Sequence, residues 1–214
     1  ILVTPFVTIF CGVAISYAIA PPIGAVANAF GVLINHTTVL QPFWMGIAVS
    51  VLVGIALTLP ISSAAICHTL GLVGLAGGAA VAGCCAQMVG FAVLSFRENR
   101  WGGLVSQGLG TSMLQMGNIV KKPVIWLAPT LAAAITGPVS TMIFKLKCTG
   151  VAAGMGTCGL VGPIGVIDAT EMGAFEWVGL VLVCVVLPAI LAFLFNELFR
   201  KLGWIKTGDM KLAD

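Results

Sequence analysis

A small set of neutral amide side chains stands among long apolar runs, and their chemistry suits solute binding. These amides are Gln87, Gln115 and Asn118. Each offers a donor pair and an acceptor, which matches hydroxyl-rich ligands such as sugars. The alternative is an interhelical hydrogen bond, commonly worth about 0.6 kcal/mol in membrane helices. Both interpretations stay open for Gln87, whereas the place of Asn118 at the end of a Gly-interrupted segment favours ligand contact.

An acidic stretch later in the chain holds the candidates for charge or proton chemistry, Asp168, Glu171 and Glu176. Ionisable groups at membrane depth are costly and usually functional, so Asp168 and Glu171 could contact a solute or a proton. The alternative places them in a solvated connection outside the membrane. Glu176 is the weaker candidate because it abuts Trp177, a residue type common at membrane interfaces.

Catalytic and metal chemistry finds no support in the residue patterns. No Ser/His/Asp set, phosphate-binding loop or HExxH motif occurs, so we expect no catalytic residue. His36 is a weak site candidate beside Asn35, and His68 is expected to pack among small residues. Cys148 and Cys158 lack nearby histidines, so we expect no metal site and no cofactor, and we interpret the cysteines as reduced.

Apolar helices must position these side chains. The 214 residues are 59% hydrophobic and 8% charged, whereas a soluble domain carries about 25% charged residues. No Asp, Glu, Lys or Arg occurs between Ile1 and Phe96. Because a bilayer core needs about 20 helical residues per crossing, the sequence predicts an all-α, polytopic transmembrane helix bundle. The net charge of +3 is too small for a nucleic-acid footprint.

Proline, glycine and charged residues divide the chain into candidate crossings. We expect residues 1–214 to be one membrane domain that lacks its N-terminal spans, because the chain enters an apolar run at Ile1 without a basic leader. The candidate crossings are Ile1–Ala20, Ile23–Leu40, Phe43–Leu59, Leu70–Phe96, Trp101–Val120, Val124–Phe144, Val151–Val166 and Val178–Phe195.

Two Gly-rich segments share a G-x-G-T-x-x-L pattern, at Gly108–Leu114 and Gly154–Leu160. Each interior Gly costs a helix about 1 kcal/mol against Ala, so continuous helices are disfavoured. Broken backbone at membrane depth occurs where it is buried in protein or lines a cavity, and paired interrupted segments point to a transporter's substrate site. The pattern therefore predicts two re-entrant hairpins, with surface loops as the alternative.

The hairpin hypothesis assigns roles to individual residues. The glycines that would permit the tight backbone are Gly108, Gly110, Gly154 and Gly156. The candidate ligand contacts are Thr111, Gln115, Asn118, Thr157 and Glu171, with Asp168 and Gln87 in addition. It further predicts that Asn118→Ala abolishes solute binding while the protein stays folded.

The distribution of basic residues supports this topology. If each Gly-rich segment enters and leaves on one side, eight of the ten Lys and Arg share a side, and only Lys145 and Lys147 lie opposite. If only the first segment crossed, the split would become six against four. Since cytoplasmic loops carry the excess of Lys and Arg, we expect a cytoplasmic C-terminus.

Several stretches carry a family resemblance. They are Cys85–Asn99, Gln107–Gln115, Asn118–Val120, Ile125–Leu131, Ala153–Thr157 and Gly159–Gly162. Together they resemble the EIIC-like membrane proteins of the phosphotransferase system, in the branch of PfoR-type proteins, which were described as regulators of toxin production. The resemblance covers about Pro60 to Gly165 and rests on hydropathy before Pro60.

The resemblance implies a multi-span permease in a bacterial plasma membrane, a homodimer whose re-entrant hairpins hold a sugar near the midplane. EIIA and EIIB partners would relay phosphate from phosphoenolpyruvate, and EIIB would phosphorylate the sugar. Ala169-Thr170-Glu171 matches only part of the glycine–hydrophobic–Thr–Glu motif of glucose-type relatives. Two alternatives stay open: a membrane sensor that does not translocate, and an ion-coupled transporter that uses Asp168 or Glu171.

Overall fold

Helices account for most of the described residues, 9–10, 13, 29 and 32–212 of this computed structural model. After a helix at 32–40 come α2 (Pro42–Thr58), α3 (Ser63–Thr69), α4 (Gly74–Leu94), α5 (Phe96–Val105), α6 (Met116–Lys121), α7 (Leu127–Pro138), α8 (Val161–Ala169), α9 (Ala174–Val181) and α10 (Leu187–Lys201). Tighter or wider helical turns are η1 (Ser106–Gly110), η2 (Ser112–Gln115), η3 (Pro123–Trp126), η4 (Val139–Ile143), η5 (Gly150–Gly154), η6 (Cys158–Leu160) and η7 (Leu182–Val186). No strand occurs within these ranges, in agreement with the predicted all-α class.

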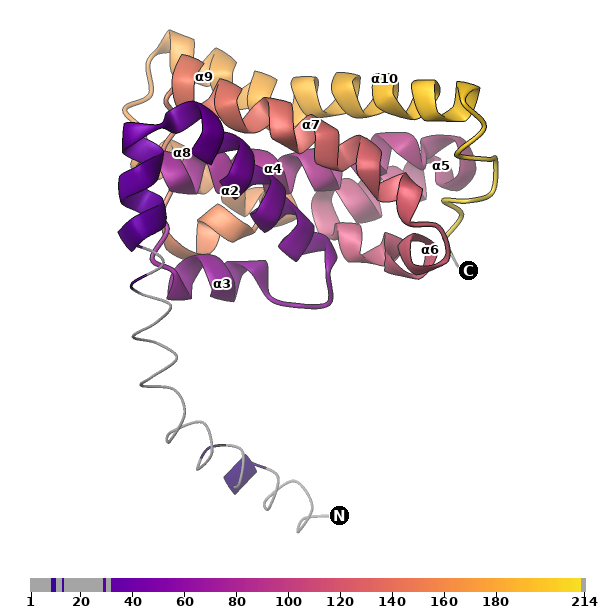
Figure 1. The fold of residues 1–214 in the computed structure, drawn as a ribbon, viewed down its shortest axis with the longest axis horizontal. Helices are drawn as coiled ribbons and strands as arrows, with labels where there is room; N and C mark the ends of the chain where they lie inside the picture. Colours follow the sequence, from indigo (N-terminus) through magenta and orange to yellow (C-terminus); the bar gives the residue numbers. More distant parts are fainter. Residues whose placement is uncertain (1–8, 11–12, 14–28, 30–31, 213–214) are drawn as a thin grey trace.

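The centre of the bundle is α4, which packs against α2, α7 and α10 (Figure 1). Its small residues allow this, because a Cβ on Gly83 would overlap the carbonyl oxygen of Ser50 on α2. On another face, a Cβ on Gly90 would lie 2.9 Å from Pro129 of α7. Such close backbone approach is typical of helix packing in membranes.

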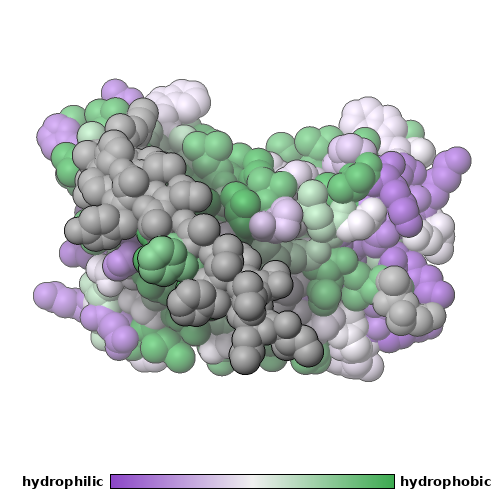
Figure 2. All heavy atoms as spheres, turned by 90° about the horizontal axis from the view of Figure 1, so that it is seen from below, coloured by the Kyte–Doolittle hydropathy of each residue, from purple (hydrophilic) through white to green (hydrophobic). Residues whose placement is uncertain are grey.

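Three helical stretches in the described part are long and apolar enough to cross a membrane, so the chain is a multi-pass membrane protein. They are Gly74–Leu94, Pro123–Ile143 and Ala174–Lys201. They correspond to the candidate crossings expected at Leu70–Phe96, Val124–Phe144 and Val178–Phe195. Figure 2 shows hydrophobic residues over the middle of the visible face and hydrophilic residues at both ends. The candidate crossing Ile1–Ala20 lies almost wholly outside the described residues.

The first Gly-rich region, residues 96–122, doubles back on itself, and we call it the first fold-back segment. At its start, the Glu98 carboxylate accepts a 2.8 Å hydrogen bond from the backbone N–H of Met210. At its end, Lys122 forms an ion pair of 2.5 Å with Asp209. Both ends therefore lie against one short segment, residues 206–212.

The second Gly-rich region, residues 147–170, does the same at the opposite end of the bundle, and we call it the second fold-back segment. The Thr170 hydroxyl accepts a 2.9 Å hydrogen bond from the N–H of Lys147 and lies 3.1 Å from the Lys147 carbonyl oxygen. In Figure 1, α8 and α9 stand at one end of the bundle, whereas α5 and α6 stand at the other. The two segments thus start from opposite ends.

Candidate functional site

The two fold-back segments meet at their middles. The Thr157 hydroxyl, in the second segment, donates a 2.5 Å hydrogen bond to the carbonyl oxygen of Gly108 in the first. Thr157 is only 3% exposed, and η1 packs against η6 around this bond. The two stretches that share the G-x-G-T pattern therefore form one contact region inside the bundle.

In the first segment the helix breaks at Thr111. This residue is extended, with φ −158° and ψ 143°, between η1 and η2. Its hydroxyl accepts a 3.2 Å hydrogen bond from the N–H of Met113, which satisfies a donor at the start of the next turn. Gly110, directly before the break, has nothing within 4 Å of the position a Cβ would take.

In the second segment the two predicted glycines, Gly154 and Gly156, lie very close to neighbouring helices. Gly156 has φ +55°, and a Cβ there would lie 2.7 Å from the Cβ of Cys84 in α4. A Cβ on Gly154 would lie 2.5 Å from the Ser63 carbonyl oxygen. The Ser63 hydroxyl also donates a 2.7 Å hydrogen bond to the carbonyl oxygen of Gly154. These contacts fix the second segment against α3 and α4.

An open cavity of about 470 Å³ lies where both segments meet the connection from α2 to α3. Its polar lining residues are Ser62, Ser63 and Thr111, and its apolar walls include Met113 and Met155. The residues that line it are all uncharged. Hydroxyls beside apolar walls suit a neutral, hydroxyl-bearing solute, because each hydroxyl can donate and accept.

A buried polar network stands directly behind this cavity. The Ser112 and Thr58 hydroxyls are 3.0 Å apart, and the Thr58 hydroxyl donates to Oε1 of Gln87 at 3.4 Å. Gln87 donates in turn to the Thr130 hydroxyl at 3.1 Å, and Trp126 Nε1 donates to Gln87 Oε1 at 3.2 Å. Gln87 therefore makes interhelical hydrogen bonds that tie the first fold-back segment to α2, α4 and α7.

Gln115 and Asn118 face away from the cavity toward residues 206–212. The Gln115 amide donates to the Met210 carbonyl oxygen at 3.0 Å, and the Asn118 amide donates to the Lys211 carbonyl oxygen at 2.9 Å. A 2.8 Å hydrogen bond joins the two amides, from Asn118 to Gln115. In this arrangement both side chains hold a backbone segment.

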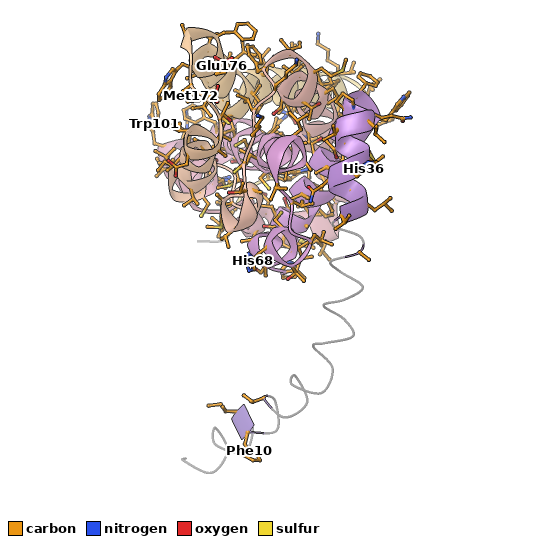
Figure 3. All side chains as sticks on the ribbon, turned by 90° about the vertical axis from the view of Figure 1, so that its left-hand side faces the viewer. Phe10, His36, His68, Trp101, Met172 and Glu176 are labelled. Atoms are coloured by element: carbon orange, nitrogen blue, oxygen red, sulfur yellow. The ribbon has the colours of Figure 1, made fainter. Side chains whose placement is uncertain are left out.

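The acidic candidates and the histidines also lie apart from the cavity. Asp168 and Glu171 are exposed at the end of the bundle where the second fold-back segment begins and ends. Glu176 accepts a 3.0 Å hydrogen bond from the N–H of Gly173, at the start of α9. Figure 3 shows Glu176, His36 and His68 on separate sides of the bundle. No cluster of three potential metal ligands occurs in the part of the chain that the structure describes.

The sequence-based prediction missed several polar residues of the cavity and of the network behind it, among them Ser62, Ser63, Thr58 and Ser112. Ser112 directly follows the G-x-G-T pattern, and that adjacency was the signal for it. Thr58 carries no such signal, because it is an ordinary hydroxyl at the end of an apolar run.

Comparison with known proteins gives one match. The family described as "Phosphotransferase system, EIIC" matches residues 1–212. Neither the curated proteins nor the solved structures give a match. The matched range contains both fold-back segments, the cavity and the polar network.

Proposed function

We propose that this chain, which belongs to the EIIC family of the phosphotransferase system, is the permease component that holds a sugar or a related polar solute. Membership of the family makes it a membrane component of a phosphotransferase-system transporter. The observation that carries the finer proposal is the uncharged, hydroxyl-lined cavity between the two fold-back segments. In this proposal both segments are re-entrant hairpins, and the solute sits between their tips.

The chemistry of the cavity favours a neutral polyol over an acidic solute. Its volume of about 470 Å³ falls in the range of small-molecule sites, about 300–1,000 Å³. The Thr111 and Ser62 hydroxyls supply hydrogen bonds, while Met113 and Met155 supply apolar surface for the C–H faces of a sugar ring. A carboxylate or phosphate ligand would need a cationic partner in such a site.

The predicted site residues then divide by role. Thr111 contacts the solute directly. Thr157 and Gln87 position the segments that form the cavity, through the bonds to Gly108 and to Thr130. The rocking of one hairpin-bearing unit against the other, as transporters with paired repeats do, would expose the solute to each side in turn.

The orientation follows from charge. The end of the bundle with Lys122 and Arg200 would face the cytoplasm of a bacterium, because most of the basic residues gather there. The C-terminus would be on this side, as would the EIIA and EIIB proteins that supply the phosphoryl group. We also propose that the protein is a homodimer, as the family resemblance implies.

The first test is the thermal stability of the purified full-length protein against a panel of sugars, polyols and acidic solutes. A ligand at 100 times its dissociation constant should stabilise the protein by about 2.7 kcal/mol. Thr111→Val should remove this gain, and because it also removes the acceptor for the N–H of Met113, the unliganded protein should lose about 0.5–2 kcal/mol of stability. The matched control is Thr149→Val, which should keep the gain, because Thr149 is exposed and its side chain makes no capping hydrogen bond.

Transport is tested separately, in vesicles that contain the protein and are supplied with its EIIA and EIIB partners and with the proteins that pass phosphate to EIIA from phosphoenolpyruvate. Uptake that requires phosphoenolpyruvate and yields a phosphorylated sugar supports the permease. Binding without uptake would favour the sensor, and uptake that a protonophore abolishes would favour ion coupling. If no solute of the panel stabilises the protein, or if Thr111→Val binds a solute with full affinity, the proposed site is contradicted.

A further inference from the structure

We propose that a groove between α5 and α10, separate from the solute cavity, binds one anionic phospholipid with a hydroxyl-bearing headgroup, such as phosphatidylglycerol. The acyl chain would lie on the apolar walls of the groove, the phosphate on Arg97, and a headgroup hydroxyl on Asn196. This inference concerns the lipid surface of the bundle and stands independently of the solute.

The shape and lining of the groove suit an acyl chain. It has a volume of about 350 Å³. Apolar side chains from α4, α5 and α10 line it, namely Val93, Leu94, Phe96, Trp101, Leu104 and Phe193. Two polar residues, Arg97 and Asn196, complete the lining. None of these residues lines the solute cavity.

Arg97 has the geometry to hold a phosphate. Its NH2 atom lies 2.8 Å from Oε1 of Glu197, and its guanidinium lies 5.9 Å from the ring centroid of Phe193. The side chain is still 54% exposed. A guanidinium carries five N–H donors, so this ion pair leaves donors free for the bidentate contacts that phosphates accept.

The charge of this end of the bundle matches an anionic headgroup. The basic side chains here are Arg97, Arg100, Lys121, Lys122, Arg200, Lys201, Lys206 and Lys211. Against these eight cations, the described residues of this end contribute three carboxylates, from Glu98, Glu197 and Asp209. The excess of positive charge attracts anionic lipids.

Asn196 gives the second, independent sign of a ligand. Its side chain is 2% exposed, and its Oδ1 atom has no hydrogen-bond partner among the described residues. A buried polar atom without a partner is costly, and a hydroxyl donor in the groove would satisfy it. The headgroup hydroxyls of phosphatidylglycerol are such donors, whereas phosphatidylcholine has none.

Trp101 places the groove at the depth of lipid headgroups. The chain turns sharply at Arg100, with φ 52° and ψ −147°. This turn brings Trp101 edge-on to Phe96, with ring centroids 5.4 Å apart. Trp101 is 71% exposed, and Figure 3, viewed along the bundle, shows it at the periphery. Exposed tryptophans of membrane proteins concentrate at this interface.

The test uses the full-length protein in mixed micelles with lipids brominated on their acyl chains, which quench nearby tryptophan fluorescence. The signal of Trp101 is the fluorescence of the protein minus that of its Trp101→Phe variant. This subtraction removes the contribution of the other tryptophans. We expect half-quenching at an about tenfold lower mole fraction of brominated phosphatidylglycerol than of brominated phosphatidylcholine, the size expected of a charge-assisted hydrogen bond.

Variants separate a built site from general attraction to a basic surface. Arg97→Gln should remove most of the preference and leave the part that the Asn196 contact supplies, and Arg97→Lys, which keeps the charge but lacks the fork, should reduce it less. The Asn196→Leu variant should still bind brominated phosphatidic acid. In this variant phosphatidylglycerol should no longer bind better than phosphatidic acid. Lys201→Gln removes an exposed charge of the same end that lies outside the groove, and should keep the full preference.

Three results would overturn the proposal. The first is equal quenching of Trp101 by both lipids in the unaltered protein. The second is an equal loss of preference in Lys201→Gln and Arg97→Gln, which would show that only overall charge matters. The third is an unchanged preference in Arg97→Lys and Asn196→Leu. Should Arg97→Gln fail to fold, the Arg97→Lys and Asn196→Leu variants still decide the outcome.

Discussion

The hydrogen bond from Thr157 to the carbonyl oxygen of Gly108, 2.5 Å long, joins two segments that enter the bundle from opposite ends. Each partner belongs to the shared G-x-G-T pattern, but they occupy different places in it. Gly108 is the first glycine of one copy, and Thr157 is the threonine of the other. The second copy thus meets the first through a side chain, while Thr111, the equivalent threonine, faces the cavity.

Thr157→Val should weaken both stability and solute binding. The substitution keeps the shape but leaves the Gly108 carbonyl without its donor, at a cost of about 1–3 kcal/mol. Thr157→Ser retains the hydroxyl, so its stability and solute affinity should lie between those of Thr157→Val and of the unaltered protein. Thermal unfolding with and without the solute identified by the panel measures both effects. A Val variant with unchanged stability would show that this contact contributes nothing.

Gly156→Ala should destabilise the protein far more than Gly110→Ala. At Gly156 the backbone has φ +55°, and the new Cβ would lie 2.7 Å from the Cβ of Cys84. The left-handed conformation alone costs about 1–2 kcal/mol, and the overlap with α4 adds to it. Gly110 has open space at the same position of its own segment. The measurement is the unfolding temperature of the two variants, and similar values would contradict this geometry.

Much of the fold was predictable because membrane helices are specified by composition. Apolar runs bounded by Pro60, Arg97 and Lys122 predict the crossings. The repeated pattern also singled out the two segments that meet in the structure, and with them Thr111 at the cavity. These are local signals, carried by residue type and spacing.

The pairing of individual polar side chains was not predictable in the same way. The ligand contact of Asn118 stays a prediction, and in this structure its amide donates to the carbonyl oxygen of Lys211. Thr58 and Ser112 share a hydrogen bond across two elements that no sequence spacing relates. An amide binds a sugar hydroxyl and a backbone carbonyl equally well, so only the tertiary arrangement distinguishes the two roles.

Asn118→Ala should loosen residues 206–212. It removes the bonds to Lys211 and to Gln115. Limited trypsin digestion at Lys206 or Lys211 should therefore become faster. Its effect on solute affinity should be smaller than that of Thr111→Val, whereas a complete loss of binding would restore Asn118 as a ligand contact.

Acid should weaken the attachment of residues 206–212 to the bundle. Burial raises the pKa of Asp209, but hydrogen bonds from Lys122 and from the N–H of Lys206 outweigh it and hold the pKa below its ordinary 3.8. The folded state therefore prefers the carboxylate, and this stabilisation is complete above pH 3.8 and is lost as the pH falls below it. Hydrogen exchange of the Lys206 amide, corrected for the intrinsic rate, should accelerate in that range. Asp209→Asn should remove the pH dependence, and its persistence in that variant would assign it to another group.

Glu171→Gln and Asp168→Asn should leave phosphoenolpyruvate-dependent uptake close to its original rate. Both carboxylates are exposed and belong to the end of the bundle where the second fold-back segment begins and ends, outside the cavity lining. A carboxylate that carries a coupling proton must exchange it between the two sides through the transport site, and neither residue stands at the cavity that the two segments form. The measurement is solute uptake into vesicles across a range of pH, with and without a protonophore, for each variant and for the double variant. Thr111→Val serves as the positive control, because it should lower uptake at every pH. A strong loss in Glu171→Gln together with sensitivity to the protonophore would instead establish ion coupling.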